Sequence, residues 1–439
     1  MKKPQLNFFN LVIVVALLVA ASYIDSCGKD KQEATDNKLV LVYPSHLDNL
    51  YEEIEVGGKK LGIIHIYSDY PDYKWIEAKG EGIACIDDVA RAAIFYSQYY
   101  SSNHERIYLH KVKMLTEFIL FMQAQNGYFY NFIEVDYSIN KTYKTSVAEP
   151  NWWSWRAAWA LSETYNLFAQ SDPAFADQIK KSMDKLFNTI KKNLPVKKNV
   201  KEIAGFERPL WLQGETGADQ TSILILALTN YLKISKEPSL LTYLNDLCDG
   251  ILKMQEGSET NFPYCAFMSW ENLWHAYGNS RSYALLKTYE VTHNKKYLHA
   301  ALKEIDNFYP YIIKKNYLNY FSIRKEGGNI IADEMNQFSQ IAYCLRPMIF
   351  ASLEAAKITK KKFYSNLAGK LSLWFFGKNI SGEKMYDITT GICFDGINNQ
   401  NSLNKNSGAE STIEALLSLS AVQNNKAAFS IVEKYLEHK

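Results

Sequence analysis

Residues 80–93 read GEGIACIDDVARAA, and this stretch holds the pattern on which the fold of the chain is built. A tight glycine turn is followed by two carboxylates, Asp87 and Asp88, and then by an amphipathic helix. A short carboxylate at a helix start accepts hydrogen bonds from the unpaired backbone N–H groups there. We therefore expect Asp87 or Asp88 to cap the helix, which leaves the other carboxylate for a second task.

The same pattern, a polar or glycine-rich turn followed by two helices, recurs five more times. The first helices of the six units are expected to begin near Asp88, Trp152, Thr216, Glu271, Glu334 and Gly408. Their mean spacing of about 64 residues, with two helices per unit, is typical of a helical-hairpin array. An open array would need polar capping repeats, and the sequence offers none. We predict an all-α fold, an (α/α)6 toroid of six helical hairpins over residues 80–439; the alternatives are an open solenoid or two unrelated bundles.

The N-terminal residues predict export. Lys2 and Lys3 precede an apolar run, Phe8–Ala21, as in a secretory signal. Residues 24–27, ending in Cys27, resemble a bacterial lipobox, although Asp25 departs from that pattern. We expect residues 1–27 to be a lipoprotein signal peptide, Cys27 to be lipidated, and residues 28–38 to be a flexible tether. The protein would then be anchored to the bacterial cell envelope, on its periplasmic or cell-surface side; the alternative is an uncleaved signal anchor.

Composition narrows the function further. The formal charge is only +2, and no long basic run points to nucleic acid. The five cysteines besides Cys27 are scattered and lack CxxC spacing, so we expect buried thiols, no disulfide framework, no metal site and no cofactor. The chain is 47% hydrophobic and 14% aromatic, which is enough for a core and for a binding surface. Residues 39–79 are expected to be an irregular lead-in packed on the toroid.

All six turns are expected at the N-terminal ends of the first helices. In a toroid these helices form the inner ring and run parallel, so the turns converge on one rim around one funnel. The turns are rich in carboxylates, Trp and Tyr. Aromatic rings stack on sugar faces, and carboxylates and amides bind sugar hydroxyls, so we expect an oligosaccharide or polysaccharide ligand.

Three carboxylates are the candidates for catalysis: Asp87, Asp88 and Glu215. Glycosidic cleavage uses two carboxyl groups, about 6.5–9.5 Å apart for inversion and about 5–5.5 Å apart for retention. We expect Glu215 to be the general acid, because apolar neighbours at 210–212 would desolvate it and raise its pKa. Asp88, or Asp87 if Asp88 caps the helix, would be the base beside Arg91.

Ten further residues are candidates for substrate binding: Arg91, Trp153, Arg156, Asp219, Trp270, Glu271, His275, Tyr277, Glu334 and Glu410. Arg91 and Arg156 lie early in helices, where the dipole disfavours positive charge, so we expect them to pair with carboxylates or to bind an acidic sugar. Trp153 lies off the helical stripe of its tryptophan neighbours and is the better sugar platform. The alternative for the carboxylates is helix capping, and for His275 a place in the core.

Four motifs resemble those of six-hairpin glycosidase-like domains, which also occur fused to bacterial glycosyltransferases. They are IDDVARA at 86–92, FYNF at 129–132, RAAWAL at 156–161 and GAEST at 408–412. The resemblance covers residues 80–420 and places the chain with an uncharacterised lipoprotein branch of that superfamily. It implies a carbohydrate-active toroid and assigns no catalytic pair.

Three functions follow as hypotheses. The first is an exported glycoside hydrolase that acts on an oligosaccharide, with acidic sugars as one option. The second is a polysaccharide lyase that acts on uronates with Asn272, His275, Tyr277 and Arg281. The third is a glycan-binding lipoprotein without catalysis.

Overall fold

The computed structural model describes residues 39–439 of the protein, so the expected signal peptide with Cys27 and the tether lie outside the described residues. Leu41–Lys439 form one compact unit. No helix within residues 39–439 is both long enough and apolar enough to cross a membrane. The five cysteines in this range are all buried and free.

Twelve of the helices form six consecutive hairpins. In chain order they are α3 (Ile86–Asn103) and α4 (Arg106–Phe121), α5 (Trp152–Phe168) and α6 (Pro173–Lys191), α7 (Ala218–Ile234) and α8 (Pro238–Leu252), α9 (Arg281–Thr292) and α10 (Lys295–Lys314), α11 (Arg346–Thr359) and α12 (Lys362–Ser372), and α13 (Ala409–Gln423) and α14 (Lys426–Glu437). The two helices of each hairpin pack against each other. The mainly helical fold predicted from the sequence is confirmed.

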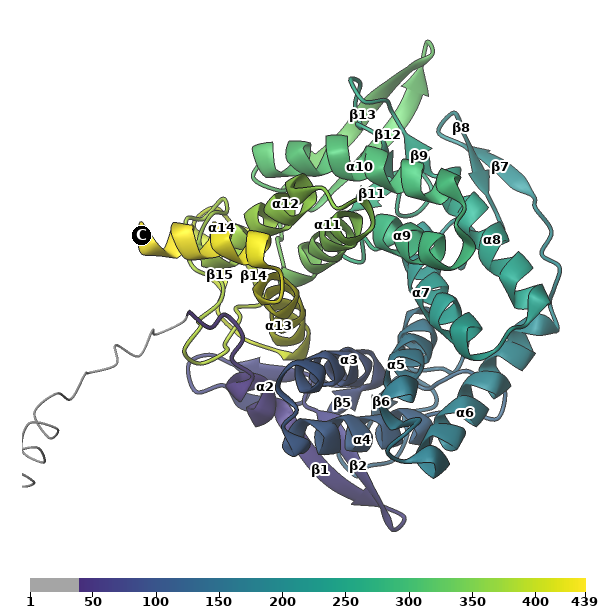
Figure 1. Ribbon diagram of the computed structural model, residues 1–439, viewed down its shortest axis with the longest axis vertical. Helices are drawn as coiled ribbons and strands as arrows, with labels where there is room; N and C mark the ends of the chain where they lie inside the picture. The colour runs from purple at the N-terminus through teal and green to yellow at the C-terminus, as the bar shows by residue number, and fades with distance from the viewer. Residues whose placement is uncertain (1–38) are drawn as a thin grey trace, which may run out of the picture. The chain divides into compact units, whose positions relative to one another are not determined.

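The first helices of the hairpins form a closed series of neighbours. Each of α3, α5, α7, α9 and α11 contacts the next first helix along the chain, and α13 contacts α3. Figure 1 shows these six helices around a common centre, with the second helix of each hairpin outside them. The turns that precede them therefore come from distant parts of the sequence to the same end of the ring.

Burial explains which helix of a pair lies inside. Helix α7 buries almost every residue from Ala218 to Leu232, because it is covered by neighbours on all sides. Helix α6 buries one stripe, which includes Phe175, Ile179 and Leu186, and exposes Lys181 and Lys185. A single apolar stripe is typical of a helix that packs on one face only.

We had expected the lead-in, residues 39–79, to be irregular, but it contains regular secondary structure. It contains α2 (Ser45–Leu50), a hairpin of β1 (Tyr51–Val56) and β2 (Lys59–Ile64), and a hairpin of β3 (Tyr67–Asp69) and β4 (Lys74–Ile76). The β1–β2 turn is Gly57-Gly58, both with positive φ, which is a standard signal for a tight hairpin. Strand β2 packs on α4 and α2 packs on α13.

Two predicted helix starts, Glu271 and Glu334, are wrong. Both regions belong to a three-stranded sheet of β11 (Leu273–His275), β12 (Tyr320–Glu326) and β13 (Asn329–Asn336), and Glu334 lies exposed on β13. The β12–β13 turn is Gly327-Gly328, and both glycines have a positive φ, as a tight hairpin requires. The fourth and fifth inner helices start later, at Arg281 and Arg346.

The remaining strands form short two-stranded pairs in the connecting loops. They are β5 (Ala84–Cys85) with β6 (Phe132–Ile133), β7 (Val200–Ile203) with β8 (Phe206–Pro209), β9 (Gln255–Glu256) with β10 (Ala266–Phe267), and β14 (Gly396–Asn399) with β15 (Ser402–Asn404). Two short 3-10 helices, η1 (Ala342–Cys344) and η2 (Leu373–Phe376), complete the described chain.

Candidate active site

A cavity of about 390 Å³ opens where the turns before α3, α11 and α13 meet the β3–β4 hairpin. Its wall carries five carboxyl groups and one guanidinium group: Glu81, Asp87, Asp88, Asp395, Glu410 and Arg91. Aromatic and apolar side chains complete it, among them Ile66, Tyr67, Phe132 and Tyr343. Four of the predicted site residues, Asp87, Asp88, Arg91 and Glu410, therefore share one cavity.

Strand β5 leads directly into α3, and this junction positions both aspartates. The backbone N–H of Ile86 donates to the Asn131 carbonyl at 2.7 Å, and that of Asp87 donates to the Asn131 side chain at 3.3 Å. The N-cap is Cys85, whose sulfur accepts from the Asp88 N–H at 3.4 Å. The expectation that Asp87 or Asp88 caps the helix is wrong, because the helix starts one residue before this pair. Both carboxylates thus remain for other contacts.

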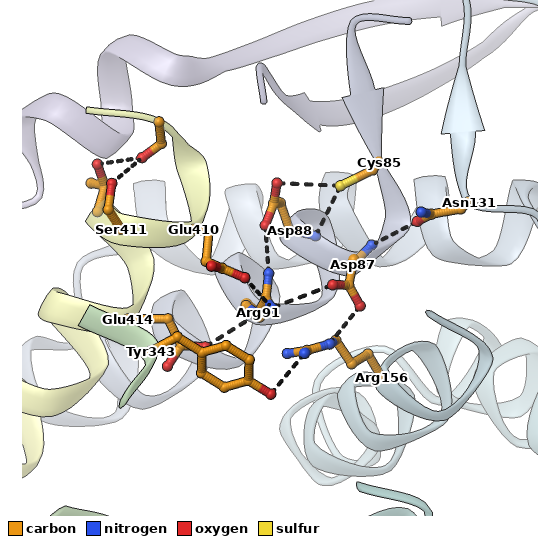
Figure 2. Close-up of polar contacts among 12 residues, drawn as sticks. Cys85, Asp87, Asp88, Arg91, Asn131, Arg156, Tyr343, Glu410, Ser411 and Glu414 are labelled. Carbon is orange, nitrogen blue, oxygen red and sulfur yellow. Dashed lines mark hydrogen bonds and ion pairs between the residues drawn. The ribbon is translucent and has the colours of Figure 1, made fainter. Parts of the chain in front are cut away.

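Arg91 lies at the centre of the cluster, one helical turn after the aspartates (Figure 2). Its Nη1 lies 2.7 Å from Asp88 Oδ1, and its Nη2 lies 2.7 Å from Glu410 Oε2 and 3.3 Å from Asp87 Oδ2. Its Nε lies 3.1 Å from Glu414 Oε1. One buried guanidinium group therefore fixes four carboxylates that come from α3 and α13.

A second layer of charge supports this cluster. Arg156 Nε lies 2.5 Å from Asp87 Oδ1, and its Nη2 donates to the Tyr343 hydroxyl at 2.8 Å. Arg346 Nε lies 2.6 Å from Glu414 Oε2. The guanidinium groups of Arg91, Arg156 and Arg346 all lie over the Tyr343 ring, at 4.9, 4.9 and 5.3 Å from its centroid. Tyr343 thus connects three inner helices, α3, α5 and α11, and Glu414 of α13 joins the same group because it binds Arg91 and Arg346.

The environment changes the acidity of several groups. Burial raises the pKa of Asp88 in spite of the ion pair with Arg91. Burial also raises the pKa of Glu410, and the nearby Asp88 and Glu414 carboxylates add to the effect, whereas Arg91 opposes it. The side chain of Glu410 nevertheless keeps 42% of its surface exposed, toward the cavity. A carboxyl group whose pKa is raised and that faces a cavity is suited to general acid catalysis.

Asp395 is a further wall residue whose carboxyl group is held in place. Its Oδ1 accepts from the Gly408 N–H at 2.8 Å and from the Ser411 hydroxyl at 2.6 Å. Burial raises the pKa of Asp395 although these hydrogen bonds oppose the shift. The turn before α13 is thereby tied to the segment that leads into β14.

A second group of predicted residues gathers at the turns before α7 and α9. His275 Nε2 lies 2.9 Å from Asp219 Oδ2, and its Nδ1 donates to the Tyr277 carbonyl at 2.8 Å. The His275 ring is buried and stacks on the Tyr277 ring with centroids 3.8 Å apart. Tyr277 itself is 43% exposed. These three predicted binding residues thus form one unit, in which an exposed phenol ring stacks on a buried histidine–aspartate pair.

The two groups adjoin across Trp152 and Tyr343. Gly278, directly after Tyr277, has a positive φ of 67° and packs so closely that a Cβ there would lie 2.9 Å from the Trp152 ring. The same Cβ would lie 3.3 Å from the Tyr343 hydroxyl. The turns before α5, α9 and α11 therefore meet beside the cavity.

Other predicted site residues lie elsewhere or differ from expectation. Trp153 is not an exposed platform: it is buried, and its indole N–H is within hydrogen-bond distance of the Phe129 and Val147 carbonyls. Glu215 does not line the cavity. Its side chain is exposed, because Trp211 and Leu212 are buried below the turn and do not cover it. Trp270 is exposed. The Glu271 N–H donates to the Thr216 hydroxyl at 3.0 Å, which joins the turns before α7 and α9.

Sequence reasoning missed Tyr343, Asp395 and Glu414. Tyr343 was missed together with Arg346 because the fifth inner helix was expected at Glu334; Pro347, in the first turn of α11, was a signal for the true start. Glu414 lies four residues after Glu410 and thus on the same helix face, which the sequence alone could have indicated. Asp395 lies in a loop with no periodic signal.

The cavity is not arranged as a metal site. Among residues 39–439, no group of three or more His, Cys, Asp or Glu side chains is placed to hold a metal ion. The carboxylates of the cluster instead converge on Arg91.

No protein-family model matches the chain, and no curated protein matches it in sequence. Solved structures do match it. A cellobiose 2-epimerase from Bacillus thermoamylovorans is 12% identical, with a TM-score of 0.59, and the match covers 87% of this chain and 96% of that one.

Two further structures extend the comparison. An inactive variant of an α-1,6-mannanase from Salegentibacter, in which two successive aspartates are replaced by alanine, was solved in complex with α-1,6-mannotetrose. It is 12% identical, with a TM-score of 0.53, over 86% of this chain and 95% of that one. A D-mannose isomerase is 13% identical, with a TM-score of 0.53, over 84% and 91%. These enzymes have the six-hairpin fold, so the resemblance seen in the motifs is confirmed at the level of the fold.

Proposed function

We propose that the protein is a carbohydrate-active enzyme, built as an (α/α)6 toroid, that hydrolyses a glycosidic bond in the cavity around Arg91. The observation that carries the proposal is the pair of Asp87 and Glu410 on one nitrogen of Arg91. Both carboxyl groups are partly exposed in one cavity, and glycosidic cleavage requires two such groups. The fold shared with enzymes that convert sugars supports the proposal.

The spacing of the pair favours retention. Since Nη2 lies 3.3 Å from Asp87 Oδ2 and 2.7 Å from Glu410 Oε2, these two oxygens are at most about 6 Å apart. Inverting enzymes hold their carboxyl groups about 6.5–9.5 Å apart, and retaining enzymes about 5–5.5 Å. The roles differ from those expected from the sequence, in which Glu215 was the acid.

Each carboxyl group has a role in this scheme. Glu410, with its raised pKa, protonates the leaving oxygen, and the Asp87 carboxylate attacks the anomeric carbon. Water deprotonated by Glu410 then displaces Asp87 from the sugar. Asp88 is buried against Arg91 and Cys85 and holds the cluster in position. The mannanase variant gives this scheme indirect support, because there the loss of activity accompanies replacement of two successive aspartates.

The lyase hypothesis has little support. It requires groups that neutralise a uronate carboxylate, but Asn272 donates to the Ile323 carbonyl and the buried Arg281 donates to the Phe267 carbonyl. The Arg281 side chain is fully buried and cannot reach a ligand, and the Asn272 amide is already engaged with the backbone. A glycan-binding protein without catalysis is tested by the experiment below.

A sugar epimerase or isomerase is the second candidate. Four of the matching structures carry these names, and the His275–Asp219 pair could serve as an acid–base couple. However, both ring nitrogens of His275 face acceptors, so the ring is held in place by its partners. None of the residues in the cavity wall is a histidine. Hydrolysis by carboxyl groups therefore has the better geometry.

The test is a panel of oligosaccharides incubated with the purified protein. New reducing ends without absorbance from unsaturated uronates indicate hydrolysis, new ends with that absorbance indicate a lyase, and a changed sugar without new ends indicates epimerisation. We expect new reducing ends with retained anomeric configuration. Binding with no product of any kind would overturn the proposal in favour of a glycan-binding protein.

We also propose export and anchoring through Cys27, supported by the charged N-terminus, the apolar run and the lipobox-like residues 24–27. The change Cys27→Ser should abolish labelling by a fatty-acid analogue and release the protein from the membrane fraction. Unchanged fractionation with an intact N-terminus would contradict lipidation and favour an uncleaved anchor.

A further inference from the structure

The cavity wall is strongly unbalanced in charge. Its five carboxyl groups face a single cation, Arg91. All three nitrogens of that cation are already engaged, with Asp88, with Asp87 and Glu410, and with Glu414. No basic side chain of the wall is therefore available for an acidic ligand.

The two arginines behind the wall offset part of this negative charge but offer no contact to a ligand. Arg156 and Arg346 are buried and are not part of the wall. The Nη1 atom of each arginine lacks a hydrogen-bond partner, but neither atom is accessible to solvent. A ligand in the cavity therefore meets the carboxylates and not these cations.

The carboxyl groups already repel one another. The pKa of Asp88, of Asp395 and of Glu410 is raised, first by burial and then in part by the nearby Asp87, Asp69 and Asp88 carboxylates, respectively. A further negative charge in the cavity would add to this repulsion, because like charges brought together in a desolvated site are costly.

The rest of the wall suits a neutral sugar. The side chains of Ile66, Cys85 and Phe132 form a buried apolar cluster at the cavity. Tyr67 and Ser411 supply hydroxyl oxygens at the same wall, which can accept hydrogen bonds although each hydroxyl donates to a carboxylate of the protein. Apolar surface beside hydrogen-bonding groups matches the faces and hydroxyls of an uncharged hexose.

We propose that the cavity accepts an uncharged hexose unit and rejects uronic, sulfated and phosphorylated sugars. This inference rests on the proposed function in that it assigns the substrate class of the same site. We had expected Arg91 and Arg156, near the starts of their helices, either to pair with carboxylates or to bind an acidic sugar. Because both arginines bind carboxylates of the protein itself, an acidic substrate is no longer favoured.

The test compares matched ligands in a binding experiment. Isothermal titration of the full chain would use pairs of oligosaccharides that differ only at C6, a hydroxymethyl group in one and a carboxylate in the other, in the gluco, manno and galacto series. We expect a neutral member to bind and its acidic partner to bind at least about tenfold more weakly. Equal or tighter binding of the acidic member, or binding of no neutral member, would overturn the inference.

A charge reversal at the wall sharpens the result. Glu81→Arg places a cation at the cavity and should narrow the difference within a pair by strengthening the acidic member. Glu202→Arg, on exposed strand β7, is the matched control and should leave the difference unchanged. If both variants behave alike, the carboxylates of the wall do not set the preference.

Failure of this inference and failure of the proposed function give different results. A neutral sugar that binds without being cleaved removes the hydrolase and leaves the substrate class. An acidic glycan that is cleaved in preference to its neutral partner leaves the hydrolase and removes the substrate class.

Discussion

The cavity around Arg91 and the group around His275 adjoin in the ring but are built differently. In the cavity, a buried guanidinium group contacts four carboxylates, and a second layer of arginines supports them. In the His275 group, one histidine contacts one aspartate, and the aromatic ring stacked on it is exposed. One region concentrates charge; the other presents a flat ring.

The difference indicates a division of labour. Burying charged groups together costs free energy and shifts their pKa values, and catalytic groups commonly need shifted pKa values. An exposed phenol held by a buried partner supplies a stacking surface with little loss of conformational freedom. We infer that the cavity carries the reaction and that the His275 group holds a neighbouring sugar.

The largest expected effect is on turnover. Glu410→Gln removes the proton donor and should lower kcat by about 10²–10⁴-fold, the usual contribution of a general acid. Glu215→Gln, at an exposed position outside the cavity, should change kcat by less than about twofold. Steady-state kinetics on any glycan that the parent protein cleaves measures both. The opposite order would restore Glu215 as the acid and remove the distinction between the regions.

The next effect is on stability. Arg91→Leu leaves four carboxylates without their shared cation and should destabilise the fold by about 3–5 kcal/mol. Arg324→Leu, which removes an exposed arginine paired with Glu326 and Asp333, should cost no more than about 1 kcal/mol. Urea unfolding of both variants gives the comparison. Equal losses would mean that the charge cluster does not stabilise the ring.

A smaller effect is expected in the second region. Tyr277→Ala should raise KM by about 2–10-fold with little change in kcat, because it removes a stacking ring outside the chemistry. Tyr277→Phe keeps the ring and should restore the parent KM. A fall in kcat with unchanged KM would instead place Tyr277 among the catalytic groups.

The smallest effect concerns pH. Because burial and the Asp88 and Glu414 carboxylates raise the pKa of Glu410, the acid stays protonated above the usual range for glutamate. Activity should fall as pH rises through that raised pKa. Glu414→Gln removes one of the negative charges, so it should move this basic limb of the pH–rate profile to lower pH. A limb that moves to higher pH, or not at all, would mean that another group carries the proton.

The helical repeat could be predicted from the sequence, but its exact phase could not. Four inner helices start where the turns place them, near Asp88, Trp152, Thr216 and Gly408. The other two start later because the segment just after Glu271 forms β11 and the segment that contains Glu334 forms β13.

The site was predicted where a local motif carries it and missed where folding creates it. Asp87, Asp88 and Arg91 lie within one motif, and Glu410 lies in another at the same end of the ring. Three arginines from α3, α5 and α11 contact the Tyr343 ring, and no local sequence pattern predicts such a long-range contact. For Glu215 the local sequence was misleading, because its apolar neighbours along the chain are buried below the turn and leave the glutamate exposed.

The most direct test of the central claim is to see where the sugar binds. A structure of the Glu410→Gln variant soaked with a cleavable oligosaccharide should show the scissile oxygen within hydrogen-bond reach of the side chain at position 410. The anomeric carbon should lie beside Asp87, and a neighbouring sugar should lie on Tyr277. A sugar bound with its scissile bond beside Glu215, and with the cavity around Arg91 empty, would contradict the account.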